Sequence, residues 1–537
     1  MSEFLVRPRG IIYRVIFIFL LAAGGSDSGV RAQNADLSFL LTAPERTGFD
    51  QTTRYDEVIA FLGVAAAQHP QMHMTTFGYT AEGRAMPLIV FGDVADASPD
   101  AVLESGKLRV FVQGNIHAGE VAGKEALLML IRSLASGEHA SWTDSLVLLF
   151  APIYNSDGNE RVSLFNRPRQ NGPLAGMGQR PNAQGLDLNR DHMKVKSPEA
   201  RSLIALMNAY DPYVAVDLHT TNGTRHGYHL TYSPALNPNT DPGIDSFVRD
   251  TFLPAVTDHI RDRTGWEYYY YGNLPFRRGD PGWYTFDHRP RFNNNYIGLR
   301  NRIPILSEAY AYLTFEDRIL ASLYFVEEIL NYAGRHVSEI TATVTTADDS
   351  MIPGMKMGVR FEHEMNSASS SILMGAVVEK RNPYSGTPYF ERIDSTYVVE
   401  MAEYGAFCAV ETESLPDHYW VSNNAAGVVA SYLETHGIRY EAISEDVTMM
   451  VNAFNIDSTS TSPREFQQLK ERTIWGSYRR REVVLEKGSL YVPGDQPLSR
   501  LLFYLIEPRS DDGLVNWAQM DKWVEAGMTY PVYQSLK

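Results

Sequence analysis

The chain has 537 residues, of which 44% are hydrophobic and 21% charged, an ordinary composition for a globular protein. This length predicts two or three domains and a sizeable hydrophobic core. A formal net charge of −16 argues against nucleic acid or anionic membrane as a partner, because both are polyanions. The single cysteine, Cys408, excludes a disulfide within the chain and any thiolate-rich metal site.

The first 32 residues have the pattern of a secretion signal. Arginines precede the apolar run Val15–Ala23, and Val30-Arg31-Ala32 resembles a small-x-small cleavage site. The apolar run is too short for a membrane-spanning helix, which needs about 20 residues. We therefore predict that residues 1–32 are a cleaved signal peptide. The mature protein is expected to be secreted or periplasmic, without attachment to a membrane.

Strand and helix patterns alternate from residue 55 to residue 333. A helix at 55–68 precedes a hairpin of strands 72–79 and 86–91 that turns at Gly83. Later strands are predicted at 108–113, 146–153, 214–218 and 303–307, and helices at 120–134, 198–210 and 315–333. This alternation predicts an α/β domain over residues 33–340, with a mixed, mainly parallel sheet sandwiched by helices.

The pattern changes near residues 341–350, a stretch of Thr, Ala and Asp in which we find no periodicity. Short β-like runs follow, including 371–379 and 485–492, together with one predicted helix at 423–436. Residues 341–537 are therefore predicted to form a separate C-terminal domain, β-rich or α+β. The sequence does not indicate its role.

Two histidines and two glutamates follow the predicted buried strands. His117 and Glu120 come after the first, His219 ends the third and Glu308 ends the fourth. In open α/β sheets, ligands bind at the carboxyl ends of the strands. Zinc hydrolases use about three His or carboxylate ligands with an open position for water, which the metal makes acidic, and a further carboxylate to transfer its proton.

Each of these residues is a weak signal by itself. A His-x-x-Glu pattern is expected about once by chance in a chain of this composition. A lone histidine at a strand end is more often a hydrogen-bonded structural residue than a metal ligand. The conjunction of all four side chains at the ends of consecutive strands is what favours a metal site.

Seven short motifs occur in order between residues 50 and 335. They are Glu82-Gly83-Arg84, Gly114–Glu120 (GNIHAGE), Asn155–Gly158 (NSDG), Asn166–Arg169 (NRPR), Asp187–Arg190 (DLNR), Asp217–His219 (DLH) and Ser307-Glu308. In this order they resemble the zinc carboxypeptidases of the carboxypeptidase A type. The resemblance implies one Zn²⁺ held by His117, Glu120 and His219, with Glu308 as general base and acid.

The resemblance also implies a substrate-binding pair. Asn189 and Arg190 correspond to the residues that grip the terminal carboxylate of the substrate, and an arginine fork binds a carboxylate bidentately. Arg169 resembles the arginine that stabilises the oxyanion, with Arg167 as the alternative because the loop spacing differs slightly. Tyr284 is the candidate for the tyrosine that covers the substrate, and Tyr296 is its competitor.

The chain departs from the family pattern in places. The family usually has proline where this chain has Ser156, and the segment between Glu120 and His219 is shortened. Arg291, with Asn293 nearby, is expected near the bottom of the side-chain pocket. That position leads to the hypothesis that the enzyme prefers an acidic C-terminal residue, because a buried arginine without a partner is costly.

These observations predict a zinc-dependent metallocarboxypeptidase that hydrolyses the C-terminal bond of peptides with a free carboxylate. One alternative is a zinc amidohydrolase acting on cell-wall peptides or N-acyl amino acids, since these substrates also carry a carboxylate. Another is a non-catalytic binding protein on the same fold, which would be expected to lack a ligand or the general base. Neither is missing here. The sequence does not indicate the oligomeric state.

Overall fold

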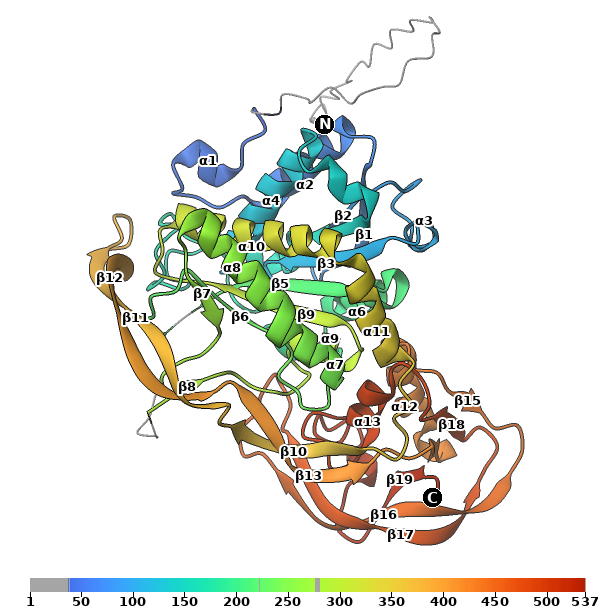
Figure 1. The fold of residues 1–537 in the computed structure, drawn as a ribbon. Coiled ribbons are helices and arrows are strands. Elements are labelled where there is room, and N and C mark those ends of the chain that lie inside the picture. Colours follow the sequence, from blue (N-terminus) through green and yellow to red (C-terminus); the bar gives the residue numbers. More distant parts are fainter. Residues whose placement is uncertain (1–36, 38, 222, 276–280, 537) are drawn as a thin grey trace, which may run out of the picture.

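The computed structural model describes residues 37, 39–221, 223–275 and 281–536 (Figure 1). The predicted signal segment, residues 1–32, lies outside the described residues. Among the helices described, none is both long enough and apolar enough to cross a membrane.

An eight-stranded mixed sheet forms the centre of the N-terminal part (Figure 1). Its strands are β1 (Met72–Tyr79), β2 (Ala85–Phe91), β3 (Leu108–Gly114), β4 (Leu146–Ala151), β5 (Val214–Thr220), β6 (Leu230–Ser233), β7 (Tyr268–Tyr270) and β9 (Ile303–Ala309), in the order β1-β2-β4-β3-β5-β9-β6-β7. The central strands β4, β3, β5 and β9 are parallel. They are buried on both faces, so their sequences are continuous apolar runs. The predicted mixed, mainly parallel sheet is confirmed.

Helices and irregular turns connect these strands. They are α1 (Ala43–Thr47), α2 (Tyr55–Gln68), α3 (Pro99–Glu104), α4 (Ala122–Ala135), η1 (Ala140–Asp144), α5 (Ser156–Glu160), η2 (Leu188–Arg190), α6 (Pro198–Tyr210), α7 (Pro242–Ser246), η3 (Phe247–Phe252), α8 (Leu253–Thr264), α9 (Asn293–Leu299) and α10 (Phe315–Arg335). Helices α2, α4, α8 and α10 cover one face of the sheet. On the other face, α6 and α9 pack together with side chains from beyond residue 415.

The prediction of an aperiodic stretch at 341–350 is wrong. Helix α11 (Val337–Asp348) follows α10 almost directly, and it buries Ile340, Val344 and Ala347 against the main core. This spacing of four and three residues is the apolar stripe of an amphipathic helix. The predicted domain boundary at residue 340 therefore falls inside a helix that belongs to the N-terminal core.

The rest of the chain is β-rich, as predicted. It contains β10 (Lys356–Glu364), β11 (Ser367–Arg381), β12 (Pro388–Tyr404), β13 (Ala406–Ser414), β14 (His418–Val421), α12 (Asn423–His436), β15 (Glu441–Ala442), β16 (Val447–Thr461), β17 (Arg472–Leu485), β18 (Leu490–Pro493), α13 (Ser499–Ile506), η4 (Asp521–Trp523) and β19 (Thr529–Gln534). A six-stranded sheet, β15-β18-β14-β19-β16-β17, lies at the end of the molecule far from α1 (Figure 1).

Strands β11 and β12 form a long hairpin, here called the arm, that reaches back to the N-terminal part (Figure 1). At its base, β12 pairs in parallel with β8 (Trp283–Tyr284). Apolar residues of α6 and of the central sheet share one core with α12, α13 and β19. The two parts of the chain are therefore joined by a common core and by a shared sheet.

Arg291 takes part in this junction instead of lining a substrate pocket. Its side chain is 2% exposed and donates to Asp512 at 2.8 Å and to Glu471 at 2.7 Å. Asp512 also accepts from the backbone N–H of Arg291 at 2.6 Å. Because two carboxylates already neutralise this guanidinium, the hypothesis that Arg291 selects acidic C-terminal residues is wrong.

Replacing Asp512 tests the strength of this junction. Asp512→Ala would leave the buried Arg291 charge with fewer partners, so we expect the free energy of unfolding in urea to fall by about 3 kcal/mol or more. Asp495→Ala is the matched control, since Asp495 is exposed. Equal unfolding free energies for the two variants would contradict a stabilising role for this ion pair.

Candidate active site

The turn between β3 and α4 carries two of the predicted ligands on one short loop. Strand β3 ends at Gly114, and Asn115 takes a left-handed φ of 68°, which an asparagine tolerates better than most residues. The backbone N–H of Glu120 then donates to the His117 carbonyl at 2.8 Å. A Cβ at Gly119 would lie 2.8 Å from the Gly178 carbonyl oxygen, so the residue between the ligands must be small.

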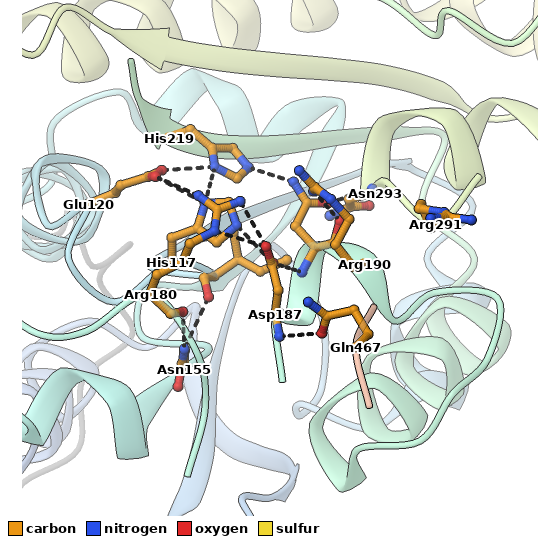
Figure 2. A network of polar contacts seen from close by, with 12 residues as sticks. His117, Glu120, Asn155, Arg180, Asp187, Arg190, His219, Arg291, Asn293 and Gln467 are labelled. Carbon is orange, nitrogen blue, oxygen red and sulfur yellow. Dashed lines mark hydrogen bonds and ion pairs between the residues drawn. The ribbon is translucent and has the colours of Figure 1, made fainter. Parts of the chain in front are cut away.

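The three predicted ligands converge on one point (Figure 2). His117 Nδ1 lies 3.0 Å from one Glu120 carboxylate oxygen, and His219 Nδ1 lies 2.9 Å from the other. The two Nδ1 atoms are 3.2 Å apart. The residues His117, Glu120 and His219 are 4%, 3% and 1% exposed. In the described part of the chain, this is the one set of three His, Cys, Asp or Glu side chains close enough to hold an ion.

The opposite nitrogens of both imidazoles are held by carboxylates. His117 Nε2 lies 3.0 Å from Asp187 Oδ1, and His219 Nε2 lies 2.9 Å from Asp217 Oδ2. Such carboxylates commonly orient metal-binding histidines and fix their tautomer. With Nε2 protonated, each Nδ1 lone pair is left for a cation.

The separations between the ligand atoms fit a zinc ion. Tetrahedral zinc with bonds of about 2.0–2.2 Å places its ligand atoms roughly 3.3 Å or slightly more apart. The observed separations of 2.9–3.2 Å are within a few tenths of an ångström of that value. Two imidazoles and one carboxylate are also a ligand set that zinc hydrolases use.

The charges around these ligands favour a cation. Burial opposes ionisation of Glu120, but Arg167 and His117 outweigh it and hold the pKa of Glu120 well below its usual range. Burial likewise opposes the charged form of His219, yet Asp217 and Glu120 raise the pKa of His219 well above its usual value. The carboxylates therefore favour positive charge at this point, and a bound cation would take the place of the proton on His219.

A cavity of about 390 Å³ opens beside the ligands, a size typical of small-molecule sites. Glu308 lines it from the end of β9, in register with His219 on β5. Burial, opposed mainly by His219, raises the pKa of Glu308 to about 8. Among the described residues, Glu308 Oε2 has no hydrogen-bond partner. This is a carboxyl group able to exchange a proton with a ligand in the cavity.

Arg180, which the sequence analysis missed, lies in the cavity beside the ligands. It lines the cavity, pairs with Asp187 at 2.8 Å and lies 3.8 Å from Glu120. Asn155, from the NSDG motif, donates to the Arg180 carbonyl at 3.2 Å and so holds its backbone (Figure 2). The predicted Arg169 lines a neighbouring cavity instead. Its prediction rested on a loop spacing, and the fold of that loop turns Arg169 away from the ligands.

The predicted alternative, Arg167, contacts Glu120 directly. It adopts a left-handed φ of 46° and also lines the neighbouring cavity. Sequence spacing could not separate these arginines, because three of them lie within fourteen residues on an irregular loop.

Arg190 lines the same cavity as the ligands and holds its charge without an acidic partner among the described residues. Its guanidinium carbon lies 3.6 Å from the ring centre of Phe292, and Nη1 donates to the Asn189 carbonyl at 2.6 Å. Burial lowers the pKa of Arg190 to about 10. Asn189 also lines the cavity, and its side-chain oxygen accepts from the Asn293 N–H at 2.8 Å. An anionic ligand would supply the missing partner of Arg190.

Neither predicted tyrosine lines the cavity. Tyr284 lies in β8 and stacks on Tyr404 of the arm, with ring centres 4.3 Å apart. Tyr296 is buried in α9, where its hydroxyl bonds to His436 Nδ1 at 2.7 Å. Tyr271 lines the cavity in their place, and burial raises its pKa. The pairing of β8 with β12 accounts for the difference, because it commits Tyr284 to a sheet that the sequence did not reveal.

The loop between β16 and β17 reaches the centre from the C-terminal part (Figure 2). Gln467 accepts from the backbone N–H of Asp187 at 2.8 Å, next to the carboxylate that holds His117 and Arg180. Gln468 anchors the same loop by contacts to Gln184 and Lys196. Residues from two distant parts of the chain therefore build this centre together.

Comparisons with known proteins agree with this geometry. Residues 58–268 match the sequence model of a family described as zinc carboxypeptidase. Over these residues the chain is similar to the zinc carboxypeptidase family, in agreement with the fold and the His-Glu-His set. Members of this family are zinc-dependent hydrolases.

Individual relatives extend the similarity. "Carboxypeptidase 2" of Trichophyton tonsurans is 24% identical over 476 residues, which cover 84% of this chain and 81% of the relative. Carboxypeptidase D of Homo sapiens is 28% identical over 206 residues, covering 33% of this chain and 15% of that protein. The solved structure of carboxypeptidase A from Helicoverpa armigera covers 55% of this chain and 77% of its own, with 17% identity and a TM-score of 0.41.

The contact from Gln467 gives a testable expectation for zinc affinity. Gln467→Ala would free the Asp187 segment, so we expect the zinc Kd, measured by chelator competition, to rise by about three- to tenfold; this is less than for loss of a carboxylate on a ligand histidine. Gln468→Ala is the matched control on the same loop, because its contacts do not touch Asp187. An equal Kd in the two variants would show that the loop does not support the centre.

Proposed function

We propose that this protein is a zinc carboxypeptidase that removes residues from the free C-terminus of peptides. One observation carries the proposal: three buried ligand atoms converge beside a cavity that also contains Glu308 and the unpaired Arg190. His117, Glu120 and His219 would hold the metal, one ion per chain. When bound, zinc supplies Lewis acidity, which lowers the pKa of a water molecule and polarises a carbonyl group.

Glu308 is the proposed general base and acid. Its raised pKa lets the carboxylate take a proton from the attacking water and hold it until the leaving amine needs it. Its pairing with His219 on the neighbouring strand supports a role beside the proposed metal site. Among the described residues that line the cavity, the other carboxylate is that of Glu120, which is the proposed ligand.

Arg180 takes the role that the sequence analysis assigned to Arg169. Its guanidinium lines the cavity beside Glu120 and keeps its charge through Asp187. A fixed cation at this position would stabilise the negative charge that develops on the scissile carbonyl oxygen. Asp187 thus orients both this arginine and His117.

Arg190 and Asn189 are the proposed binding site for the terminal carboxylate. The flat guanidinium, backed by the Phe292 ring, can donate two parallel hydrogen bonds to a carboxylate. Phe286 and Leu306 add apolar surface for the last side chain of the substrate. A charged anchor for the terminal carboxylate favours cleavage at a chain end over cleavage within a chain.

The proposed substrate is a peptide with a free C-terminal carboxylate. Secretion or a periplasmic location is proposed from the N-terminal segment alone. Hydrolysis of blocked dipeptides, compared with cell-wall peptides and N-acyl amino acids, separates these substrate classes.

Glu308→Gln separates metal binding from catalysis. The variant keeps all three ligands, so we expect about one zinc per chain, while kcat on a blocked dipeptide falls by about 10²–10⁴ because proton transfer is lost. Glu316→Gln changes an exposed glutamate on α10 and serves as the control. Activity near that of the wild type in Glu308→Gln would exclude the assigned role.

Arg190 is expected to act on substrate binding more than on chemistry. Arg190→Ala removes the partner of the terminal carboxylate, so kcat/KM should fall by about 30- to 150-fold, mostly through KM. Arg190→Lys keeps the charge without the fork and should recover only part of this loss. A substrate with an amidated C-terminus should have a low kcat/KM with the wild type, and Arg190→Ala should not lower that value further. A similar fall in kcat/KM for the amidated substrate would contradict the assigned role of Arg190.

A further inference from the structure

Two more cavities continue from the proposed active site toward the arm. The first, of about 510 Å³, shares Arg180 with the catalytic cavity and is lined also by Arg169 and Tyr312. The second, of about 570 Å³, shares Gly223 with the first. Its far wall is the arm, through Met374–Val377 and Tyr397. The three cavities therefore adjoin one another in sequence, from the one beside the proposed ligands to the one walled by the arm.

The direction of this path follows from the proposed function. A peptide whose terminal carboxylate lies on Arg190 has its scissile carbonyl beside Arg180. The residues before that bond must then leave the catalytic cavity. The cavity that shares Arg180 gives them a route, since it begins where the scissile bond would lie.

Backbone hydrogen bonds hold the arm in place along this path. On one strand, the N–H of Phe390 donates to the Arg169 carbonyl at 3.1 Å, and that of Arg392 donates to the Tyr312 carbonyl at 2.7 Å. On the other, Gly375 donates to the Arg225 carbonyl at 3.1 Å. The wall is therefore already in place before any ligand binds, which lowers the entropy cost of binding there.

Two arginines on this path have no carboxylate partner among the described residues. Arg169 and Arg225 are both exposed, and Arg225 lies over the Phe390 ring at 5.1 Å. Arg392 on the arm differs, because it pairs with Asp394 at 2.8 Å. In a chain with a net charge of −16, two cations without a carboxylate partner beside adjoining cavities form a local basic patch.

We propose that these two outer cavities bind the residues upstream of the scissile bond, and that Arg169 and Arg225 favour acidic side chains there. The inference rests on the proposed function and assigns part of the C-terminal region, the arm, to substrate recognition. The ligand is an extended peptide with glutamate or aspartate near its third and fourth residues from the C-terminus.

Peptide binding to zinc-loaded Glu308→Gln tests the inference without turnover. The probes are two N-acetylated pentapeptides that differ only in having glutamate or glutamine at the third and fourth residues from the C-terminus. We expect the glutamate peptide to bind about five- to tenfold more tightly at low salt, since exposed ion pairs contribute roughly 0.2–1 kcal/mol each. Adding 0.5 M NaCl should reduce this ratio.

Variants in the same background locate the effect. Arg169→Ala and Arg225→Ala should each reduce the glutamate-to-glutamine ratio by about two- to fourfold, and Arg225→Glu should bring it to one or below. Arg479→Ala, an exposed arginine on the distant strand β17, should leave the ratio as it was. Thermal unfolding midpoints establish that each variant is folded.

The outcomes separate this inference from the proposed function. Equal affinity for the two pentapeptides, or an unchanged ratio in both alanine variants, overturns the inference even where the wild type hydrolyses blocked dipeptides. Failure of the wild type to hydrolyse any blocked dipeptide overturns the proposed function. A glutamate preference that disappears in Arg169→Ala and Arg225→Ala supports the inference on binding alone.

Discussion

The candidate site depends on the contact of two imidazoles with one carboxylate in a buried space. Such a cluster is costly unless each group is hydrogen-bonded or binds a cation, because burial penalises charge and unmet polarity. Here Asp187 and Asp217 hold the outer nitrogens of the two histidines. The neighbouring parallel strands β3, β5 and β9 supply the positions, since their carboxyl ends meet at one edge of the sheet. The order of the strands in the sheet therefore determines where these side chains meet.

The C-terminal part is packed against the N-terminal part and contributes contacts to this site. It shares one hydrophobic core with α6 and the central sheet, and its arm extends a sheet that begins with β8. The buried pair of Arg291 and Asp512 ties the loop before α9 to the segment after α13. Gln467 reaches the backbone of Asp187. These contacts make the position of the ligands depend on residues nearly 300 places further along the chain.

The arginines around the cavity divide into groups according to their partners. Arg167 and Arg180 face carboxylates of the candidate metal site, and Arg180 also lines the cavity where a substrate would lie. Arg190, in contrast, has an aromatic ring and a carbonyl as neighbours, while Arg169 is exposed. A guanidinium without a counter-charge is the natural place for an anionic part of a ligand. This division follows from the contacts that each arginine makes in the folded protein, and sequence motifs do not reveal these contacts.

The sequence by itself predicted the central strands, most long helices and the three side chains that converge beside Glu308. These features depend on local periodicity and on short motifs. A short segment of sequence is therefore enough to predict which side chains stand at the end of a strand. The sequence could not decide between Arg167 and Arg169, and it did not indicate Arg180, because all three lie on an irregular loop whose path is set by contacts such as that of Asn155. It also misplaced Tyr284 and Arg291. Their partners, β12 and Asp512, lie more than 100 residues away, and only the tertiary structure brings them together.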